Sequence, residues 1–280
     1  MTSDNISSFI GNLGDTIKSI VKIILQSRHC RITPAENPSQ PVIIMGNGPS
    51  LNDTIKSYRT TLETHPLLAV NFAANTPEFT QLRPRYYVLA DPHFFRNADN
   101  PNVKQLCDNL NNVDWKMTLF VPSKSPAITS NKNIKIEYFN PIGVEGFNWF
   151  ENWVYKHGYG MPRPRNVLIP SIMIAMALGY RDIYITGADH SWLKTISVNN
   201  RNEVVSIQPH FYKEDTREEQ RIRTDYLNYP LHQIIYSFYI AFRSYFTIER
   251  YARYCSINIY NATPDSYIDA FRRRNLPHQQ

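Results

Sequence analysis

The pattern of apolar positions in the first 38 residues predicts an amphipathic helix followed by a linker. Apolar side chains recur every three or four residues from Ile6 to Ile24, and the basic residues fall on the other side or toward the C-terminal end. The stretch ITPAENPSQP that follows has the composition of a linker. We therefore expect residues 1–38 to lie outside the main domain. The apolar stripe must be covered, either by the chain's own domain or by a membrane surface or partner that contacts residues 6–28.

From residue 39 to 280 short apolar runs alternate with helical patterns. The runs are rich in β-branched and aromatic residues and read PVIIMG, LLAVNF, RYYVLAD, MTLFVP, IKIEYF, DIYITGAD and SINIYNA. Helical patterns such as SIMIAMALGY and LHQIIYSFYIAFRSYFTIERYARYC lie between several of them. This alternation predicts one α/β, Rossmann-like domain over residues 39–280, with a mostly parallel sheet and helices on both faces.

Polar residues and glycines end five of these predicted strands. In parallel sheets ligands bind beyond the carboxyl ends of the strands, so these residues should form a polar rim around a ligand. The five ends read Gly46-Asn47, Asn71, Asp91, Gly187-Ala188-Asp189 and Asn261.

The first strand continues into the turn Gly46-Asn47-Gly48-Pro49-Ser50. The two glycines let a ligand approach the main chain, and Ser50 can cap the next helix, whose N-terminus would attract phosphate. The turn is neither a GxGxxG motif nor a P-loop. A nucleotide cradle and a purely structural turn are therefore both open.

The strand that ends at Gly187 delivers Asp189 and His190 to the same rim. Each has a structural interpretation beside the functional one, because Asp189 could cap a helix or loop and His190 could be a buried structural histidine. His190 lacks a companion at metal-ligand spacing, so we expect no metal site.

A polar stretch at about 190–228 interrupts the alternation and is expected to form a lid. Its segment QPHFYKEDTREE places His210, Tyr212 and Glu214 within five residues. An imidazole, a phenol and a carboxylate are the groups that general-base chemistry needs near pH 7. A solvated loop would have a similar composition.

Charge and cysteine content limit the function classes. The formal net charge of +6 suits an anionic nucleotide, an acidic glycan or a membrane surface, but the basic residues are too few and too scattered for a nucleic-acid-binding protein. The three cysteines are far apart, which argues against a disulfide framework and fits a cytoplasmic protein. No apolar run reaches the roughly 20 residues of a transmembrane helix.

Four segments, in the same order, resemble the bacterial lipooligosaccharide sialyltransferases. They read VIIMGNGPSL, AVNFA, RNVLIPSIMIAMALGYRDIYITGAD and YARYCSINIYNATPDSYIDAF, and the resemblance covers about residues 41–271 in outline. A broader resemblance extends to uncharacterised proteins grouped with the 6-hydroxymethylpterin pyrophosphokinases. The sialyltransferase resemblance implies a Rossmann-like transferase that uses a CMP-linked sugar and needs neither a metal nor another cofactor.

The resemblance also implies roles for individual residues. Asn47, Gly48 and Ser50 would lie against the nucleotide, and the donor would contact the positions Asn71, Asp91, Arg165 and Asn166. In the family a tyrosine assists the departing phosphate, whereas this chain has Ser191 there, and Tyr212 could replace it. The family's His-Tyr pair reads His210-Phe211 here, and its second histidine, the base, reads Glu214. The base is therefore either His210 or Glu214.

The leading hypothesis is a metal-independent glycosyltransferase that moves a sialic acid or a related acidic sugar from a CMP-type donor to a hydroxyl of a bacterial surface glycan or glycolipid. We expect it to be cytoplasmic and peripheral on the inner face of the membrane, and a homo-oligomer is left open. One alternative is a pterin-type pyrophosphokinase that uses ATP and magnesium held by Asp91 and Asp189. The other is a non-catalytic binding protein on the same fold.

Overall fold

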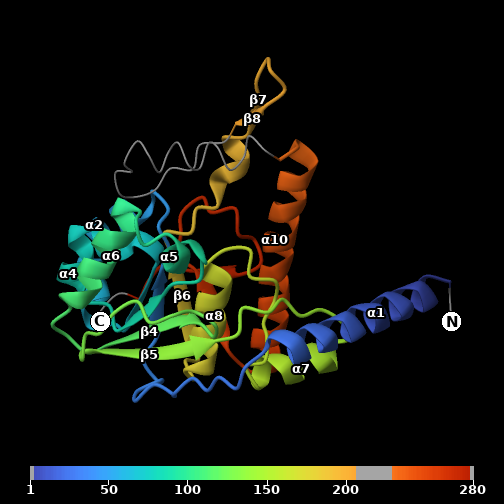
Figure 1. Cartoon of the computed structure of the whole chain (residues 1–280), viewed down its shortest axis with the longest axis horizontal. Coiled ribbons are helices and arrows are strands. Elements are labelled where there is room, and N and C mark those ends of the chain that lie inside the picture. Colours follow the sequence, from blue (N-terminus) through green and yellow to red (C-terminus); the bar gives the residue numbers. More distant parts are fainter. Residues whose placement is uncertain (1–2, 206–228, 278–280) are drawn as a thin grey trace.

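The computed structural model describes residues 3–205 and 229–277 and is built around one parallel sheet (Figure 1). Within these residues, eight strands pair in the order β10-β9-β6-β1-β2-β3-β4-β5, and every pairing is parallel. Their bounds are β1 (Val42–Met45), β2 (Leu67–Val70), β3 (Tyr86–Val88), β4 (Met117–Pro122), β5 (Ile134–Phe139), β6 (Asp182–Thr186), β9 (Asn258–Asn261) and β10 (Arg272–Arg273). The predicted α/β class with a mostly parallel sheet is confirmed.

The strand order reverses direction between β1 and β6. From β1 the chain moves outward through β2, β3, β4 and β5, and it then returns to place β6 on the other side of β1. The central strand therefore has both neighbours in register, with Ile43 opposite Leu67 on β2 and Tyr184 on β6. Such a reversal leaves a crevice at the carboxyl ends of the two strands, because their connecting segments run to opposite sides.

Helices cover both faces of the sheet because the strands are apolar on both faces. Alternate strand residues such as Val42 and Ile44 pack against α7 (Asn148–Lys156), α8 (Leu168–Ala177) and α10 (Leu231–Tyr254). Helix α8 is buried on all sides, as its continuous apolar sequence requires. Figure 1 shows α8 and α10 on this side of the sheet, away from α2, α4 and α6.

The opposite face of the sheet carries the shorter helices. Ile43 and Met45 point to this side and pack against α2 (Leu51–Ser57), α3 (Arg59–Thr64), α4 (Pro77–Leu82) and α6 (Pro101–Asn111). The short turns η1 (Asn71–Asn75) and α5 (His93–Arg96) follow β2 and β3 on the same side. The molecule is thus a three-layer α/β/α sandwich whose sheet is buried on both faces.

The predicted N-terminal helix is α1 (Ser3–Gln26), and it contacts its own domain through Thr16, Ser19 and the partly buried Ile23. Thr16 and Ser19 are buried against the loop that precedes α7, whereas the apolar stripe of the helix is exposed. No helix in the described ranges combines the length and hydrophobicity needed to cross a bilayer. The division of the chain at residue 38 stays a prediction.

The described part of the predicted lid begins with η2 (Ser191–Lys194) and the antiparallel hairpin of β7 (Ser197–Val198) and β8 (Val204–Val205). Val204 packs with Ile234 and Phe238 of α10, and this small cluster anchors the hairpin beside that helix. The predicted catalytic residues His210, Tyr212 and Glu214 lie outside the described residues, and their roles stay predictions.

Candidate functional site

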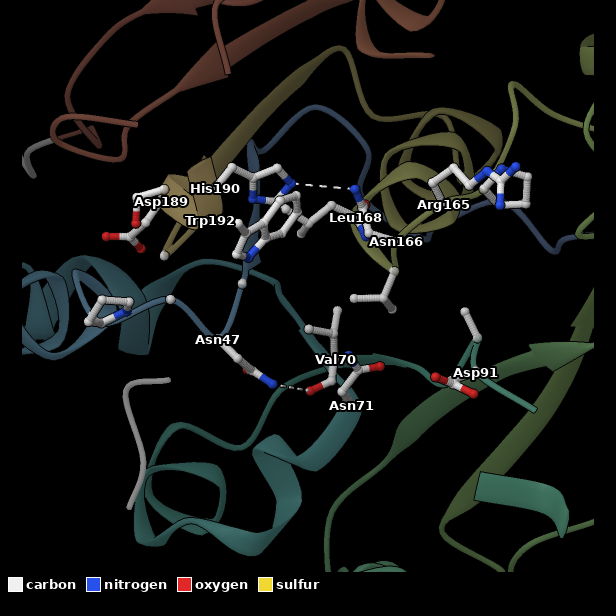
Figure 2. A pocket seen from close by; sticks show the side chains of 18 of the residues that line it. Asn47, Val70, Asn71, Asp91, Arg165, Asn166, Leu168, Asp189, His190 and Trp192 are labelled. Atoms are coloured by element: carbon white, nitrogen blue, oxygen red, sulfur yellow. Dashed lines mark hydrogen bonds between the residues drawn. The ribbon is translucent and has the colours of Figure 1, made fainter. Parts of the chain in front are cut away.

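A cavity of about 380 Å³ lies at the carboxyl ends of β1, β2, β3 and β6. All the residues expected at the nucleotide and donor site except Ser50 line it: Gly46, Asn47, Gly48, Pro49, Asn71, Asp91, Arg165, Asn166, Gly187, Asp189 and His190. Figure 2 shows Asn47, Asn71 and Asp91 on one side, with His190, Trp192, Asn166 and Arg165 across from them. Its size is within the range of small-molecule sites, about 300–1,000 Å³.

The cavity depends on the close approach of two backbone turns. The N–H of Gly46 donates to the carbonyl of Thr186 at 2.8 Å, and the N–H of Gly48 donates to that of Gly187 at 2.7 Å. A Cβ atom on Gly46 would lie 2.4 Å from the Gly187 carbonyl oxygen, and Gly187 itself has a φ of +63°. Glycine is therefore required here for packing, independently of any ligand.

Ser50 has a different role from the one expected. Its side chain does not cap α2, and it is not among the cavity-lining residues. Instead the Ser50 hydroxyl donates to Asp189 at 2.8 Å, and its N–H donates to the same carboxylate at 3.3 Å. The carboxylate of Asp189 thus accepts a backbone N–H at the N-terminus of α2. This is the capping role that the sequence analysis considered for Asp189. A phosphate at this N-terminus would meet that negative charge, so the expected phosphate cradle at α2 is not supported.

Asn47 and Asn71 connect the ends of β1 and β2. The Asn47 amide donates to the carbonyl of Val70 at 3.2 Å (Figure 2). Asn71 has a φ of +52°, a conformation that asparagine tolerates better than most residues. The Tyr87 hydroxyl holds this turn, since it donates to the Asn71 carbonyl and accepts the Ala74 N–H at 2.8 Å. The Asn71 Oδ1 is buried and has no hydrogen-bond partner in the part of the chain that the structure describes.

His190, Tyr245 and Asn166 form a buried hydrogen-bonded network in the cavity wall. The Tyr245 hydroxyl of α10 donates to Asn166 Oδ1 at 3.0 Å and lies 2.6 Å from His190 Nε2. The pair of Tyr245 and His190 is a hydrogen bond whose donor is set by the tautomer of the imidazole. Burial lowers the pKa of His190 to about 3, so the imidazole is neutral near pH 7. His190 thus has the contacts of a buried structural histidine, which was one of the two interpretations from the sequence. Its ring also lines the cavity.

Asn166 has a second structural task at the start of α8. Its Oδ1 accepts the N–H groups of Leu168 at 3.1 Å and Ile169 at 3.3 Å. Its amide lies 3.4 Å from the same His190 nitrogen (Figure 2). Asn166 therefore fixes the cavity wall to the N-terminus of a fully buried helix.

Trp192 and Tyr245 were not identified as site residues from the sequence. Trp192 lines the cavity, and its ring lies 4.1 Å from the His190 ring and 5.3 Å from that of Phe238. The sequence could have identified Trp192, because it lies two residues after His190 at the end of a predicted strand, and aromatic side chains commonly line ligand pockets. Tyr245 gave no such signal, since its position continues the apolar pattern of α10.

The two carboxylates that line the cavity accept hydrogen bonds from the protein, whereas the arginine that lines it forms no ion pair with the described residues. Asp91 accepts the N–H of His93 at 2.8 Å, and Asp189 is held by Ser50. Arg165 is exposed at the cavity, and no carboxylate in residues 3–205 or 229–277 forms an ion pair with it. The described chain also contains no cluster of three histidine, cysteine or acidic side chains placed to hold a metal ion. Among the described residues that line this cavity, Arg165 is the cation beside the carboxylates of Asp91 and Asp189, and its guanidinium suits an anionic group of a ligand.

Asn261 does not belong to the cavity. Its amide donates to Ser266 Oγ at 3.1 Å and to the Ile268 carbonyl at 3.0 Å, and its oxygen accepts the N–H of Thr263 at 3.0 Å. The residue is almost completely buried and fixes the loop after β9. The expectation that all five strand ends share one rim is therefore wrong for this strand.

The fold is similar to that of the MAf glycosyltransferase from Magnetospirillum magneticum AMB-1, with a TM-score of 0.51 and 14% sequence identity. The similarity covers 93% of this chain and 37% of that protein, so this chain spans little more than a third of its length. No protein-family model matches the sequence, and no curated protein does. At this identity the similarity shows a shared fold alone, and activity must be argued from the site. Membership of the sialyltransferase family stays a prediction.

Removing one hydroxyl should test the buried network. Tyr245→Phe leaves His190 and Asn166 without their shared partner, and a buried unsatisfied polar group costs about 1–3 kcal/mol. We expect urea unfolding to give a free energy of unfolding lower by about that amount. Tyr236→Phe, on an exposed face of the same helix, is the matched control and should unfold like the wild type. Equal stability of all three proteins would contradict the network.

Stability should fall on acidification because of His190. Its pKa is about 3 in the folded state and near 6.5 in the unfolded chain, so only the unfolded state takes up the proton between these values. The free energy of unfolding should therefore decrease as the pH is lowered from about 6.5 toward 4, by up to about 1.4 kcal/mol per pH unit from this group. Urea titrations at several pH values should show a shallower dependence for His190→Gln. The exposed His157→Gln should keep the wild-type slope, and an unchanged slope in His190→Gln would refute the assignment.

Proposed function

We propose that this chain is a glycosyltransferase that binds a nucleotide-activated sugar in the cavity at the ends of β1, β2, β3 and β6. The observation that supports the proposal most is the position of this cavity, at the point where the strand order of a parallel sheet reverses. Nucleotides commonly bind at such points in α/β proteins. The fold similarity to a glycosyltransferase supports this chemistry over other nucleotide-dependent reactions.

The lining residues match the parts of a sugar nucleotide. The carboxamides of Asn47, Asn71 and Asn166 offer hydrogen bonds to a base or ribose. The exposed guanidinium of Arg165 can pair with a phosphate, and Trp192 offers an aromatic face for a ring of the ligand. Because the start of α2 is already engaged by Asp189, we place the phosphate near Arg165 and not at the Gly46–Ser50 turn.

The transfer itself would use residues of the predicted lid. The bond between the anomeric carbon and the phosphate oxygen breaks, a new bond forms to the acceptor oxygen, and the acceptor's proton passes to His210 or Glu214. Tyr212 would stabilise the departing phosphate. These three roles, the CMP-linked acidic donor, the independence from metal and the surface-glycan acceptor rest on the sequence resemblance.

A pterin-type pyrophosphokinase would make other demands on the same cavity. It needs magnesium beside the phosphates of ATP, and its two candidate ligands were Asp91 and Asp189. Both carboxylates accept hydrogen bonds from the protein, from His93 and Ser50 respectively.

Nucleotide binding should not require magnesium. In a thermal-shift screen of CMP, UMP, GMP, AMP and ATP, each with magnesium or with EDTA, we expect CMP to raise the melting temperature equally in both conditions. Arg165→Gln should raise the Kd for CMP about tenfold or more, because it removes a charge-assisted phosphate contact. Arg253→Gln, an exposed arginine on α10, is the control and should bind like the wild type. Stabilisation by ATP with magnesium alone would favour the pyrophosphokinase.

Turnover should identify the base. His210→Ala and Glu214→Ala are each assayed for release of CMP from a CMP-linked sugar in the presence of an acceptor, and loss of a general base should lower kcat about 100- to 10,000-fold in one of them. Thermal shift with CMP shows whether each variant still binds nucleotide. If neither change affects turnover, the lid assignment is wrong. If the wild type binds CMP-linked sugars but transfers none to any acceptor, the chain is a binding protein.

A further inference from the structure

A continuous apolar stripe on α1 is exposed along most of the helix. Its large apolar side chains are between 40% and 75% exposed and comprise Ile6, Phe9, Ile10, Leu13, Ile17, Ile20, Val21, Ile24 and Leu25. Exposed apolar patches of this kind in a protein usually mark an interaction surface. Figure 1 shows the N-terminal part of α1 projecting away from the sheet and its helices.

The attachment of α1 fixes which side of the helix faces outward. Ser19 Oγ donates to the Glu145 carbonyl at 2.8 Å and accepts the Glu145 N–H at 3.0 Å, and Thr16 Oγ1 accepts the N–H of Phe147 at 3.1 Å. Gly146 allows this contact, because a Cβ atom there would lie 2.1 Å from Thr16 Oγ1. Thr16 and Ser19, with the partly buried Ile23 on the same side, thus face the domain, and the apolar stripe faces outward.

The apolar surface continues from α1 onto α7 and the end of α10. Ile20 shares a shallow hollow with Trp149 and Trp153 of α7 and with Tyr254 of α10. Trp149 is 70% exposed and Trp153 is 50% exposed. In Figure 1, α1 and α7 lie next to each other. We call the apolar residues of α1 together with these three aromatic residues the docking face.

Charge and aromatic content identify the surface that covers the docking face. Lys18, Lys22, Arg28 and Lys156 are exposed beside it, and Asp15 is paired with Lys18. Tryptophan and tyrosine favour the boundary between lipid and water, and lysines beside an amphipathic helix are attracted to anionic headgroups. A second copy of this chain would bring the same cations and no opposite charge.

We propose that the docking face binds the surface of a bilayer that contains anionic lipids, with α1 lying in the plane of the interface. The apolar stripe enters the boundary between headgroups and acyl chains, Trp149, Trp153 and Tyr254 lie at that boundary, and the flanking cations contact the headgroups. This inference does not depend on the reaction that the cavity performs.

Vesicle flotation of the full chain tests the proposal. Vesicles of phosphatidylglycerol and phosphatidylcholine at one to three should carry the wild type. The triple variant Ile10→Ser/Ile17→Ser/Ile24→Ser should partition at least about a hundredfold more weakly, because three large apolar groups no longer leave water. The control variant Leu193→Ser/Ile235→Ser/Tyr236→Ser changes exposed apolar residues away from the docking face and should float like the wild type.

Lipid charge and tryptophan quenching test the details of the docking. Lys18→Gln and Lys22→Gln should each weaken binding to the anionic vesicles about fivefold and leave binding to pure phosphatidylcholine unchanged. Brominated lipids should quench the wild-type fluorescence, and Trp149→Phe/Trp153→Phe should remove that quenching, since the other tryptophans, Trp115 and Trp192, lie elsewhere.

Three results would overturn the proposal. These are failure of the wild type to float, equal flotation of the wild type and the α1 triple variant, and equal binding to anionic and to pure phosphatidylcholine vesicles. Light scattering after size exclusion tests the alternative that a second copy of this chain covers the docking face. A wild-type dimer that the α1 triple variant converts to a monomer, without flotation of either, would assign the docking face to self-association.

Discussion

The site depends on one steric constraint, the contact between the backbone turns that follow β1 and β6. Gly46 and Gly187 lie so close that a side chain on Gly46 would overlap the main chain opposite. Two N–H groups of the first turn donate to carbonyls of β6 and its turn, so the two strand ends are joined by backbone hydrogen bonds beyond the sheet. The segments that follow β1 and β6 then run to opposite faces of the sheet, since Leu51 belongs to the core of one face and Ala188 to that of the other. The open cavity is the space between these diverging segments.

The walls of the cavity are held by side chains that bond to one another across different elements. Asp189 connects the end of β6 to the start of α2, and Tyr245 connects α10 to the start of α8 and to His190. His190 has a φ of +51°, a conformation that a non-glycine residue adopts at a cost, and the network around its ring offsets that cost. Such a site is organised before any ligand arrives, which reduces the entropy lost on binding.

Contacts of Glu145 connect the docking face to the wall of the cavity. Ser19 of α1 holds the backbone of Glu145, and the carboxylate of Glu145 pairs with Arg163 and with Arg243 of α10. Arg163 comes directly before Pro164 and Arg165, which line the cavity. Attachment of α1 to a bilayer would therefore set the orientation of the cavity relative to the lipid, which suits a transferase whose acceptor is a glycolipid.

Sequence reasoning captured the features that follow from local pattern. The β-branched runs and their polar ends predicted the parallel sheet, and glycines, Asn47, Asn71 and Asp91 were correctly expected to meet at one edge. What it missed depends on contacts between distant segments. Ser50 bonds to Asp189, which is 139 positions further along the chain, and Asn261 turns inward to fix its own loop. Tyr245 is indistinguishable from a core residue until α10 is packed against α8, where its hydroxyl meets Asn166 and His190.

The most direct test of the account is a crystal structure of the chain with CMP bound. We expect the nucleotide in the cavity between the Gly46–Pro49 turn and Trp192, with its phosphate beside Arg165 and the contact between Gly46 and Gly187 unchanged. Clear density for CMP at a site remote from this cavity, or none at a concentration that saturates binding in solution, would contradict the claim that the reversal between β1 and β6 forms a nucleotide site.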